Sequence, residues 1–200
     1  MPDKLLFQTQ NAASTTLRGQ MLLASAELNG TPFERALIYL VSHGDEGSMG
    51  VIVNQPLKKI TFGEIAKSMG IEEMMAARFG APEIIRGGPV EHTRGFVLHT
   101  GDYALPTTVS VASNISLSAS AEIVTDIAHG RGPRALNFCL GYAGWAAGQL
   151  EEELHGNGWL LLPGDEGILF DVALEKRYNA ATQKLGLTAL NFHTDITARA

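Results

Sequence analysis

Cys139 is the only cysteine of this 200-residue chain, so any thiol chemistry depends on it. It lies near the end of an alternating segment from Ala135 to Leu140, and the glycine-rich residues 141–148 follow directly. A helix that begins after such a turn presents free backbone N–H groups, which bind anions and stabilise a thiolate. This spacing supports a thiol-dependent enzyme or redox sensor. The alternative, which we favour, is a buried cysteine that fills a small apolar space.

A thiol hydrolase also needs a paired histidine, and the histidines of this chain are scattered. They are His43, His92, His99, His129, His155 and His193. They do not show the spacing of metal ligands, and a single cysteine cannot form a CxxC pair. The sequence contains no Walker motif and no dinucleotide-binding glycine motif. We therefore expect neither a metal nor a cofactor.

The segment from Arg86 to Arg94 is the most polar of the glycine-containing loops. Its glycines are expected to expose backbone donors, and its two arginines suit a carboxylate or a phosphate. The alternative is a wide turn in which Arg86, Glu91 and Arg94 form surface ion pairs. Together with the segment after Cys139, this loop is a candidate binding surface. Its residues are Arg86, Gly87, Gly88, Glu91, His92, Arg94, Gly141, Tyr142, Gly144 and Trp145.

Hydrophobic periodicity predicts one α+β domain over residues 17–186, with a loose N-terminal segment at 1–16 and a C-terminal tail at 187–200. Strands are predicted at 17–25, 36–43, 49–54, 83–87, 95–100, 107–117, 135–140, 159–162 and 168–170. Helices are predicted at 61–70, 71–79, 143–154 and 171–185, and from residue 118 or 120 to 129. Hairpins come first and mixed strand–helix units follow. This order predicts a mixed or largely antiparallel sheet flanked by helices.

Two of the predicted helices carry more specific expectations. Thr61 and Glu64 have the spacing of a capping box. In the helix at 143–154, Gly144 and Gly148 are four residues apart, which leaves one face nearly bare for close packing. We therefore predict that Gly144→Leu destabilises the fold by overpacking.

The charge balance restricts the partners. Fifteen basic and 21 acidic residues give a formal net charge of −6, and no basic run is longer than two residues. Binding to duplex DNA normally requires a basic surface, so direct DNA binding is not expected. The remaining expectation is an unidentified protein or small-ligand partner.

Membrane insertion is not expected either. The longest apolar run, residues 36–41, is far shorter than the ~20 residues that span a bilayer. The N-terminus does not resemble a secretory signal, and one cysteine forms no internal disulfide, so a cytosolic location is expected. Trp145 and Trp159 are expected in the core, and residues 151–153 on a solvated helix face.

Four blocks of the sequence resemble the AlgH-type (YqgE-like) family of bacterial proteins. They are LLASAELNGTPFERALIYLVSHGDEGSMGVIVNQPL at 22–57, GGPVEHTRGFVLH at 87–99, LGYAGWAAGQLEEEL at 140–154 and GNGWLLLPGDEGILFD at 156–171. The resemblance implies an α+β fold in which a bent, split sheet forms a pseudo-barrel flanked by helices. It implies no particular chemistry, although some members carry the label of transcriptional regulator. The chain departs from the family pattern at Ala26, Val41, Gln55 and Tyr178, where proline, cysteine, arginine and tryptophan are common.

Two interpretations of function result. The favoured one is a cytosolic binding or regulatory module without catalysis, whose glycine-containing segments contact a partner or ligand. The alternative is the thiol-dependent enzyme or redox sensor at Cys139. The two differ in whether Cys139 is accessible and has a histidine within hydrogen-bond reach.

Overall fold

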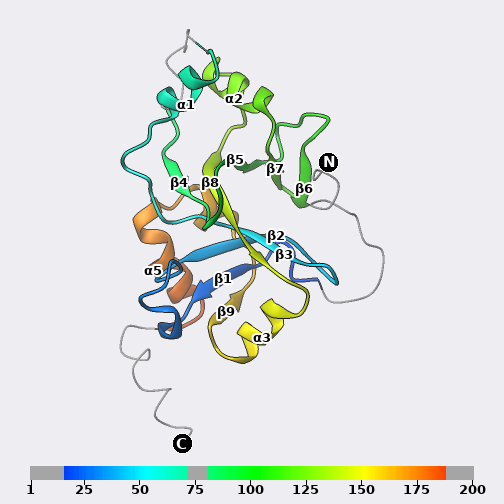
Figure 1. The fold of residues 1–200 in the computed structure, drawn as a ribbon, viewed down its shortest axis with the longest axis vertical. Helices are drawn as coiled ribbons and strands as arrows, with labels where there is room; N and C mark the ends of the chain where they lie inside the picture. Colours follow the sequence, from blue (N-terminus) through cyan, green and yellow to red (C-terminus); the bar gives the residue numbers. More distant parts are fainter. Residues whose placement is uncertain (1–15, 72–80, 188–200) are drawn as a thin grey trace, which may run out of the picture.

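The computed structural model describes residues 16–71 and 81–187. Their strands form one sheet in the order β6-β7-β5-β8-β3-β2-β1-β9, and β4 joins it by pairing with β8 (Figure 1). The bounds are β1 Met21–Ala24, β2 Leu37–Gly44, β3 Gly47–Ile52, β4 Ile84–Arg86, β5 Val90–Thr100, β6 Val109–Ala112, β7 Ile115–Ser118, β8 Leu136–Trp145 and β9 Trp159–Leu162. Each of these strand pairs is antiparallel except that of β4 with β8. The predicted mixed, largely antiparallel sheet is therefore confirmed, and it is open.

Strand β8 joins the two halves of this sheet. Its first part pairs with β4 and β5, and its last residues pair with β3. Gly141 lies where the partner changes, with a φ of +76° that favours glycine. A Cβ atom at this position would lie 2.6 Å from the carbonyl oxygen of Gly88. Gly141 therefore allows β8 to bend, in agreement with the expected bent, split sheet.

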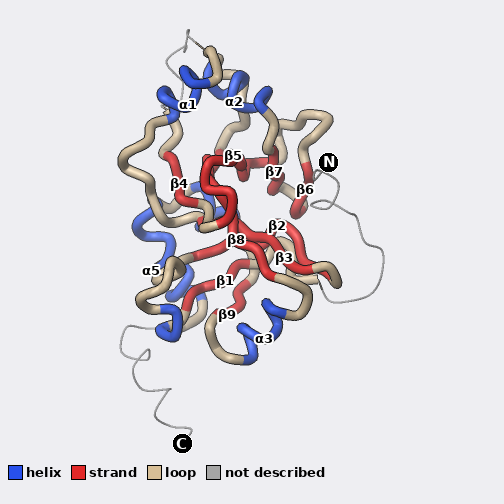
Figure 2. The backbone as a smooth tube through the Cα atoms, viewed as in Figure 1, coloured by secondary structure: helices blue, strands red, loops and turns tan. Residues whose placement is uncertain are grey.

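Helices lie around the central strands (Figure 2). They are the 3-10 helix η1 Ala26–Leu28 and the α-helices α1 Phe62–Ser68, α2 Ala121–Ala128, α3 Gln149–His155, α4 Glu166–Phe170 and α5 Leu174–Lys184. Three apolar clusters form the core: one includes α4 and α5, one includes α3, and one includes α1 and α2. Within the described ranges, the helices are too short or too polar to cross a bilayer.

Local sequence signals account for several of these elements. The capping box of α1 is present, because Thr61 Oγ1 accepts from the backbone N–H of Glu64 at 3.3 Å while Glu64 Oε2 accepts from that of Thr61 at 2.8 Å. In α2 the apolar residues Ile123, Val124, Ile127 and Ala128 recur at helical spacing, and all four are buried. The apolar strand β2 lies between β1 and β3 and is buried over Leu37–Val41.

Four predicted elements are wrong. The single strand at 107–117 is the hairpin of β6 and β7, and β5 begins inside the predicted loop, at Val90. The strand at 168–170 is helix α4, which Asp165 caps by accepting from the N–H of Ile168 at 3.0 Å. The helix at 143–154 starts only at Gln149, because pairing with β3 extends β8 to Trp145. The predicted helix at 71–79 lies outside the described residues except for its first position.

Candidate functional site

The Cys139 side chain, which carries the catalytic alternative, is fully buried. Its Sγ atom contacts the carbonyl oxygens of Ile52 at 3.7 Å and Asn137 at 3.9 Å. Burial raises the pKa of the thiol to about 12, although the nearby Arg177 acts in the opposite direction. The predicted helix start beside this thiol is wrong, because α3 begins only at Gln149. Cys139 is therefore a neutral core residue, and among the described residues its hydrogen-bond partners are backbone carbonyls and not a histidine.

Gly87 and Gly88 do not form an open recognition loop. The N–H of Gly87 donates to the carbonyl of Leu140 at 2.7 Å, and its own carbonyl accepts from the N–H of Ile52 at 2.7 Å. Both glycines are buried. A Cβ atom on Gly88 would lie 2.0 Å from the carbonyl carbon of Tyr142. Close approach of two backbone segments explains these glycines, and the predicted exposure of their donors is wrong.

Of the other predicted residues of this loop, Arg86 ends β4, and Glu91, His92 and Arg94 lie on β5. Glu91 and Arg94 form an ion pair of 3.1 Å, as the alternative interpretation expected. His92 is exposed nearby. The neighbouring ring of Tyr142 meets that of Phe96 edge-on, with centroids 5.7 Å apart. Of the ten residues in the predicted binding surface, only Arg86 lines either of the two pockets described below.

Gly144 is exposed on strand β8 and does not belong to a packed helix face. The nearest atom to a Cβ placed there is Cε2 of Tyr142 at 3.3 Å, so the stated reason for Gly144→Leu to destabilise the fold is wrong. Trp145 is buried, as expected, and its Nε1 donates to Glu153 Oε2 at 2.9 Å. Trp159 donates to the same oxygen at 2.8 Å. The half-buried Glu153 thus accepts from two core side chains, which corrects the expected solvated position for this residue, whereas Glu152 is exposed as expected.

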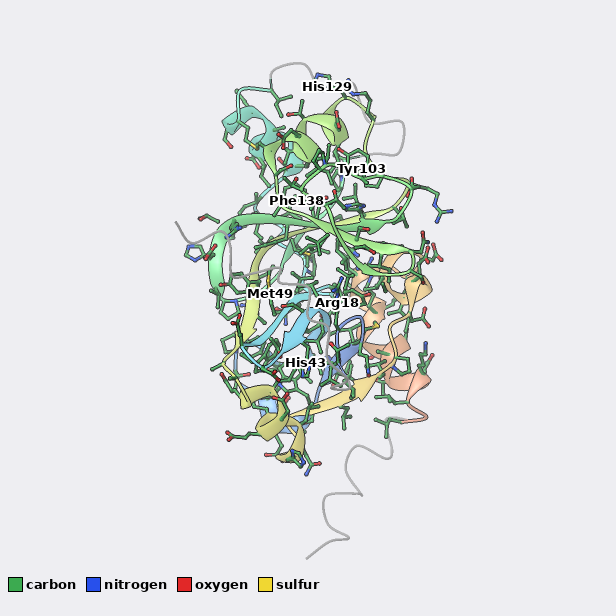
Figure 3. All side chains as sticks on the ribbon, turned by 90° about the vertical axis from the view of Figure 1, so that its right-hand side faces the viewer. Arg18, His43, Met49, Tyr103, His129 and Phe138 are labelled. Atoms are coloured by element: carbon green, nitrogen blue, oxygen red, sulfur yellow. The ribbon has the colours of Figure 1, made fainter. Side chains whose placement is uncertain are left out.

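The described histidines do not gather at one place. His129 lies at the end of α2, whereas His43 lies in the opposite half of the molecule (Figure 3). Within residues 16–71 and 81–187, no group of three or more histidine, cysteine or acidic side chains could hold a metal ion. His99 is fully buried, with Nδ1 2.9 Å from the carbonyl of Thr100 and Nε2 3.0 Å from Ser118 Oγ. Because a carbonyl only accepts, Nδ1 carries the proton and Nε2 accepts from the hydroxyl.

Two open pockets adjoin the first turn of α5 and share Glu175. The first, called here the Arg35 pocket, has a volume of about 400 Å³. Its polar lining consists of Glu34, Arg35, Asn54, Gln55, Arg86 and Glu175. The Arg35 guanidinium lies 4.5 Å from the ring centroid of Tyr178. Arg86 donates from Nε to Gln55 Oε1 at 3.0 Å and from Nη2 to the carbonyl of Pro32 at 2.6 Å.

The backbone of Arg35 is strained. Its φ of +51° is uncommon for a residue with a side chain. The Asn54 side chain holds the backbone on this side of the turn. Its Nδ2 donates to the carbonyl of Arg35 at 2.8 Å, and its Oδ1 accepts from the N–H of Leu37 at 2.8 Å. Such conformations cost about 1–3 kcal/mol each and are concentrated at functional sites. The strain therefore makes the Arg35 pocket a candidate binding site.

The second pocket, called here the Arg177 pocket, has a volume of about 370 Å³. Arg177 is only 5% exposed and donates from Nε to the carbonyl of Val172 at 2.9 Å. Its Nη1 donates to the carbonyl of Val53 and to Asn137 Oδ1, both at 2.7 Å. Asn137 in turn donates to the carbonyl of Leu169 at 3.0 Å. Burial lowers the pKa of Arg177 to about 10, so the guanidinium remains cationic at neutral pH.

The guanidinium groups of these three arginines do not form ion pairs with the carboxylates of the described residues. None of the ion pairs formed within the described ranges includes Arg35, Arg86 or Arg177. By contrast, Arg131 lies 2.8 Å from Asp126. The three guanidinium groups around α5 are held mainly by neutral acceptors and an aromatic ring, which leaves their charge available to a ligand.

Sequence reasoning identified only Arg86 among these arginines. Two signals existed for the Arg177 pocket: Asn137 interrupts an apolar strand, and Arg177 falls on the apolar stripe of the last predicted helix. A polar side chain at a buried position requires a buried partner, so each residue indicated the other. The sequence around Arg35 did not indicate its strained backbone, because Asn54, which binds the backbone at residues 35 and 37, belongs to another segment of the chain.

Comparisons with known proteins agree with the fold. The sequence profile of the AlgH-like family (DUF179) matches residues 21–190. A UPF0301 protein of Methylocella silvestris is 40% identical over 186 residues, which cover 90% of each chain. A UPF0301 protein of Saccharophagus degradans is 41% identical over 172 residues, covering 86% of this chain and 83% of the relative.

Two solved structures are also similar. The solution structure of AlgH from Pseudomonas aeruginosa superposes with a TM-score of 0.75 at 35% identity, covering 96% of this chain and 98% of that one. The crystal structure of DIP2367 from Corynebacterium diphtheriae shares the fold, with a TM-score of 0.62 at 16% identity over 88% of this chain and 90% of that one.

Proposed function

We propose that this chain, which belongs to the AlgH-like family, is a non-catalytic module that binds a small ligand bearing an anionic group. Family membership defines the fold and leaves the activity to be argued from the site. The proposed binding region is the pair of pockets beside α5. In this proposal the protein acts in the cytoplasm, and ligand binding controls its contact with a protein partner.

One observation carries the proposal: Arg35, Arg86 and Arg177 surround two adjoining pockets, and none of them is in an ion pair with a described residue. Guanidinium groups bind carboxylates and phosphates through directed, charge-assisted hydrogen bonds. The strained backbone of Arg35 adds support, because strain is retained where the surrounding structure enforces a functional geometry.

A regulatory role in transcription, which the resemblance implies, is part of this proposal only in an indirect form. The formal charge of −6 opposes direct contact with DNA, so such a role requires a protein partner. The thiol-dependent alternative receives no support, because Cys139 is fully buried and its pKa is raised to about 12. A catalytic thiol needs access and a lowered pKa.

The proposal is tested by titrating the ¹⁵N-labelled protein with inorganic phosphate and with acetate. We expect the larger chemical-shift changes at residues 34–35, 54–57 and 86, which line the Arg35 pocket. Shift changes confined to other parts of the chain, or none at all, would refute the proposal.

Two variants sharpen this test. Arg35→Gly removes the guanidinium while retaining a residue that adopts a φ of +51° without strain. Arg86→Gln removes the second positive charge. Each is expected to weaken anion binding in the Arg35 pocket. Arg131→Gln, at an exposed residue beyond the end of α2, removes one positive charge elsewhere and is expected to leave binding unchanged.

A further inference from the structure

The Arg177 pocket combines a buried cation with an acidic rim. Arg177 is 5% exposed, and Nη2 is the guanidinium nitrogen that donates to none of the described residues. The rim carries the carboxylates of Glu83, Asp171 and Glu175, all on exposed residues. A buried charge is costly unless a partner compensates it, so the floor of the pocket favours an anionic group.

The start of α5 reinforces this preference at the same place. Ala173, Leu174 and Glu175 line the pocket, and no side chain caps the helix at Ala173. The first turn of a helix presents free backbone N–H groups and a partial positive charge. An anion placed at Nη2 of Arg177 therefore also meets the positive end of an 11-residue helix.

The rim excludes a simple anion as the preferred ligand. Three carboxylates surround one guanidinium, so a ligand with only negative charge is repelled as it enters. A ligand with only positive charge is repelled by the floor. Glu83 and Glu175 stabilise the charge of Arg177 from a distance, but none of the rim carboxylates forms an ion pair with it among the described residues. A ligand that carries both charges satisfies both parts of the pocket.

The remaining wall is apolar. Ile85, Leu136, Phe170 and Leu174 contribute it, and the volume of about 370 Å³ exceeds that of a single amino acid. An α-amino acid has a carboxylate, an ammonium group and a side chain on one carbon atom. Its carboxylate matches Arg177, its ammonium group matches the rim, and an aliphatic side chain matches this wall.

We infer that the Arg177 pocket binds a small aliphatic α-amino acid as its zwitterion. The inference rests on the proposed function, since it names the ligand class of one of the two proposed pockets. The carboxylate accepts from Nη2 of Arg177 at the floor, and the ammonium group donates to the carboxylates of the rim. No covalent step is involved.

The test compares four probes by calorimetry and by ¹⁵N chemical-shift changes near neutral pH: L-leucine, N-acetyl-L-leucine, L-leucinamide and inorganic phosphate. We expect L-leucine to bind, with shift changes at residues 171–177, and each other probe to bind at least roughly tenfold more weakly at this pocket. The acetyl derivative lacks the positive charge, and the amide lacks the negative charge.

Variants of the rim carboxylates should change the affinities for L-leucine and N-acetyl-L-leucine in opposite directions. Loss of a purely structural contact would not have this effect. In Glu83→Gln and Asp171→Asn the pocket loses repulsion toward anions and attraction toward ammonium groups. Each variant is expected to bind L-leucine more weakly and N-acetyl-L-leucine more tightly than the parent. Glu152→Gln, an exposed change on α3, is the control and is expected to change neither affinity.

The outcomes separate the two proposals. If L-leucine does not bind while phosphate or acetate binds at the two pockets, the zwitterion inference is wrong and the proposed function stands. Equal binding of L-leucine and its N-acetyl derivative also overturns the inference. If no probe shifts the resonances around either pocket, both proposals fail.

Discussion

Burial shifts the pKa values of the Cys139 thiol and the Arg177 guanidinium in opposite directions. The two groups are also close enough for each to influence the pKa of the other. Burial raises the pKa of the thiol to about 12 and lowers that of the guanidinium to about 10. In both cases burial favours the uncharged form. At neutral pH the thiol is uncharged and fills space in the core. The guanidinium keeps its charge, and its hydrogen bonds offset the cost of burying that charge.

The state of Cys139 leads to a prediction about its reactivity. A buried, protonated thiol is neither accessible nor nucleophilic, so iodoacetamide should alkylate native Cys139 much more slowly than a free thiol of pKa ~8.5. Unfolding in urea should restore the ordinary rate, and it serves as the control. The measurement is the native alkylation rate across pH. A native rate above that of the free thiol, with a midpoint below about 7, would contradict the packing interpretation.

Because His99 is buried, we predict that the stability of the folded protein depends on pH. Burial lowers the pKa of His99 below its ordinary value of 6.5. The unfolded chain therefore binds this proton first, so the contribution of neutral His99 is present above pH 6.5 and is lost as the pH falls below it.

The loss is bounded by about 1.4 kcal/mol per pH unit for one group. Urea unfolding of the parent should show a decreasing free energy of unfolding between about pH 6.5 and pH 5. His99→Gln keeps a donor and an acceptor but has no titrating group, so its decrease should be smaller. The same slope in both proteins would show that His99 does not control it.

Among the elements, β8 depends on a glycine to bend between its two pairing partners. Gly141 has a left-handed φ inside the strand, and the chain continues to Trp145 in pairing with β3. Gly88 lies against this bend, where a Cβ atom would meet the backbone of Tyr142 at 2.0 Å. Backbone atoms cannot move aside as a flexible side chain can. The glycines of the two segments are therefore explained by the meeting of two sheet halves.

Helix α3 is connected to the sheet through Glu153, and this contact is testable. Glu153 Oε2 accepts from both Trp145 and Trp159, whose side chains are buried. Glu153→Ala leaves two indole N–H groups without this acceptor, and each unsatisfied buried donor costs about 1–3 kcal/mol. We expect a loss of roughly 2 kcal/mol or more in the free energy of unfolding, measured by urea titration.

The two tryptophans are the only ones in the chain, so their fluorescence reports on this contact directly. Emission of the Glu153→Ala variant should shift in the folded state. The matched control is Glu152→Ala, since Glu152 is exposed and adjacent. If the two variants have equal stability, the indole hydrogen bonds do not hold α3 to the sheet.

At the scale of the whole molecule, net charge decides which macromolecules can approach. The 15 basic residues are outnumbered by 21 acidic ones. Arg94, Arg131, Arg134 and Lys184 are each paired with a carboxylate. DNA binding depends on neutralising many phosphates, which this charge distribution does not support.

We therefore predict that the protein does not bind duplex DNA directly with more than weak affinity at physiological salt. The measurement is fluorescence anisotropy with a random-sequence duplex at two salt concentrations, with the DNA-binding competence of the assay checked by a basic protein. Sub-micromolar binding that weakens steeply with salt would contradict this prediction.

The sequence by itself determined those features that depend on neighbours along the chain. The capping box of Thr61 and Glu64 and the apolar stripe of α2 involve residues three or four apart, and both are confirmed. The antiparallel preference followed from short hairpin connections, and the family resemblance from blocks that span most of the domain. Cys139 is buried as expected, but the expected cause is wrong, because the helix predicted to cover it from residue 143 begins only at Gln149.

Only the tertiary structure decided where β8 ends and which polar residues meet. Periodicity alone favoured a helix from residue 143, but hydrogen bonding to β3, distant in the chain, keeps this segment extended. Arg177 and Asn137 are 40 residues apart and meet only because α5 packs on the sheet. Hydrogen bonds between distant segments have no signature in local spacing, which is why the α5 pockets were found in the structure and not in the sequence.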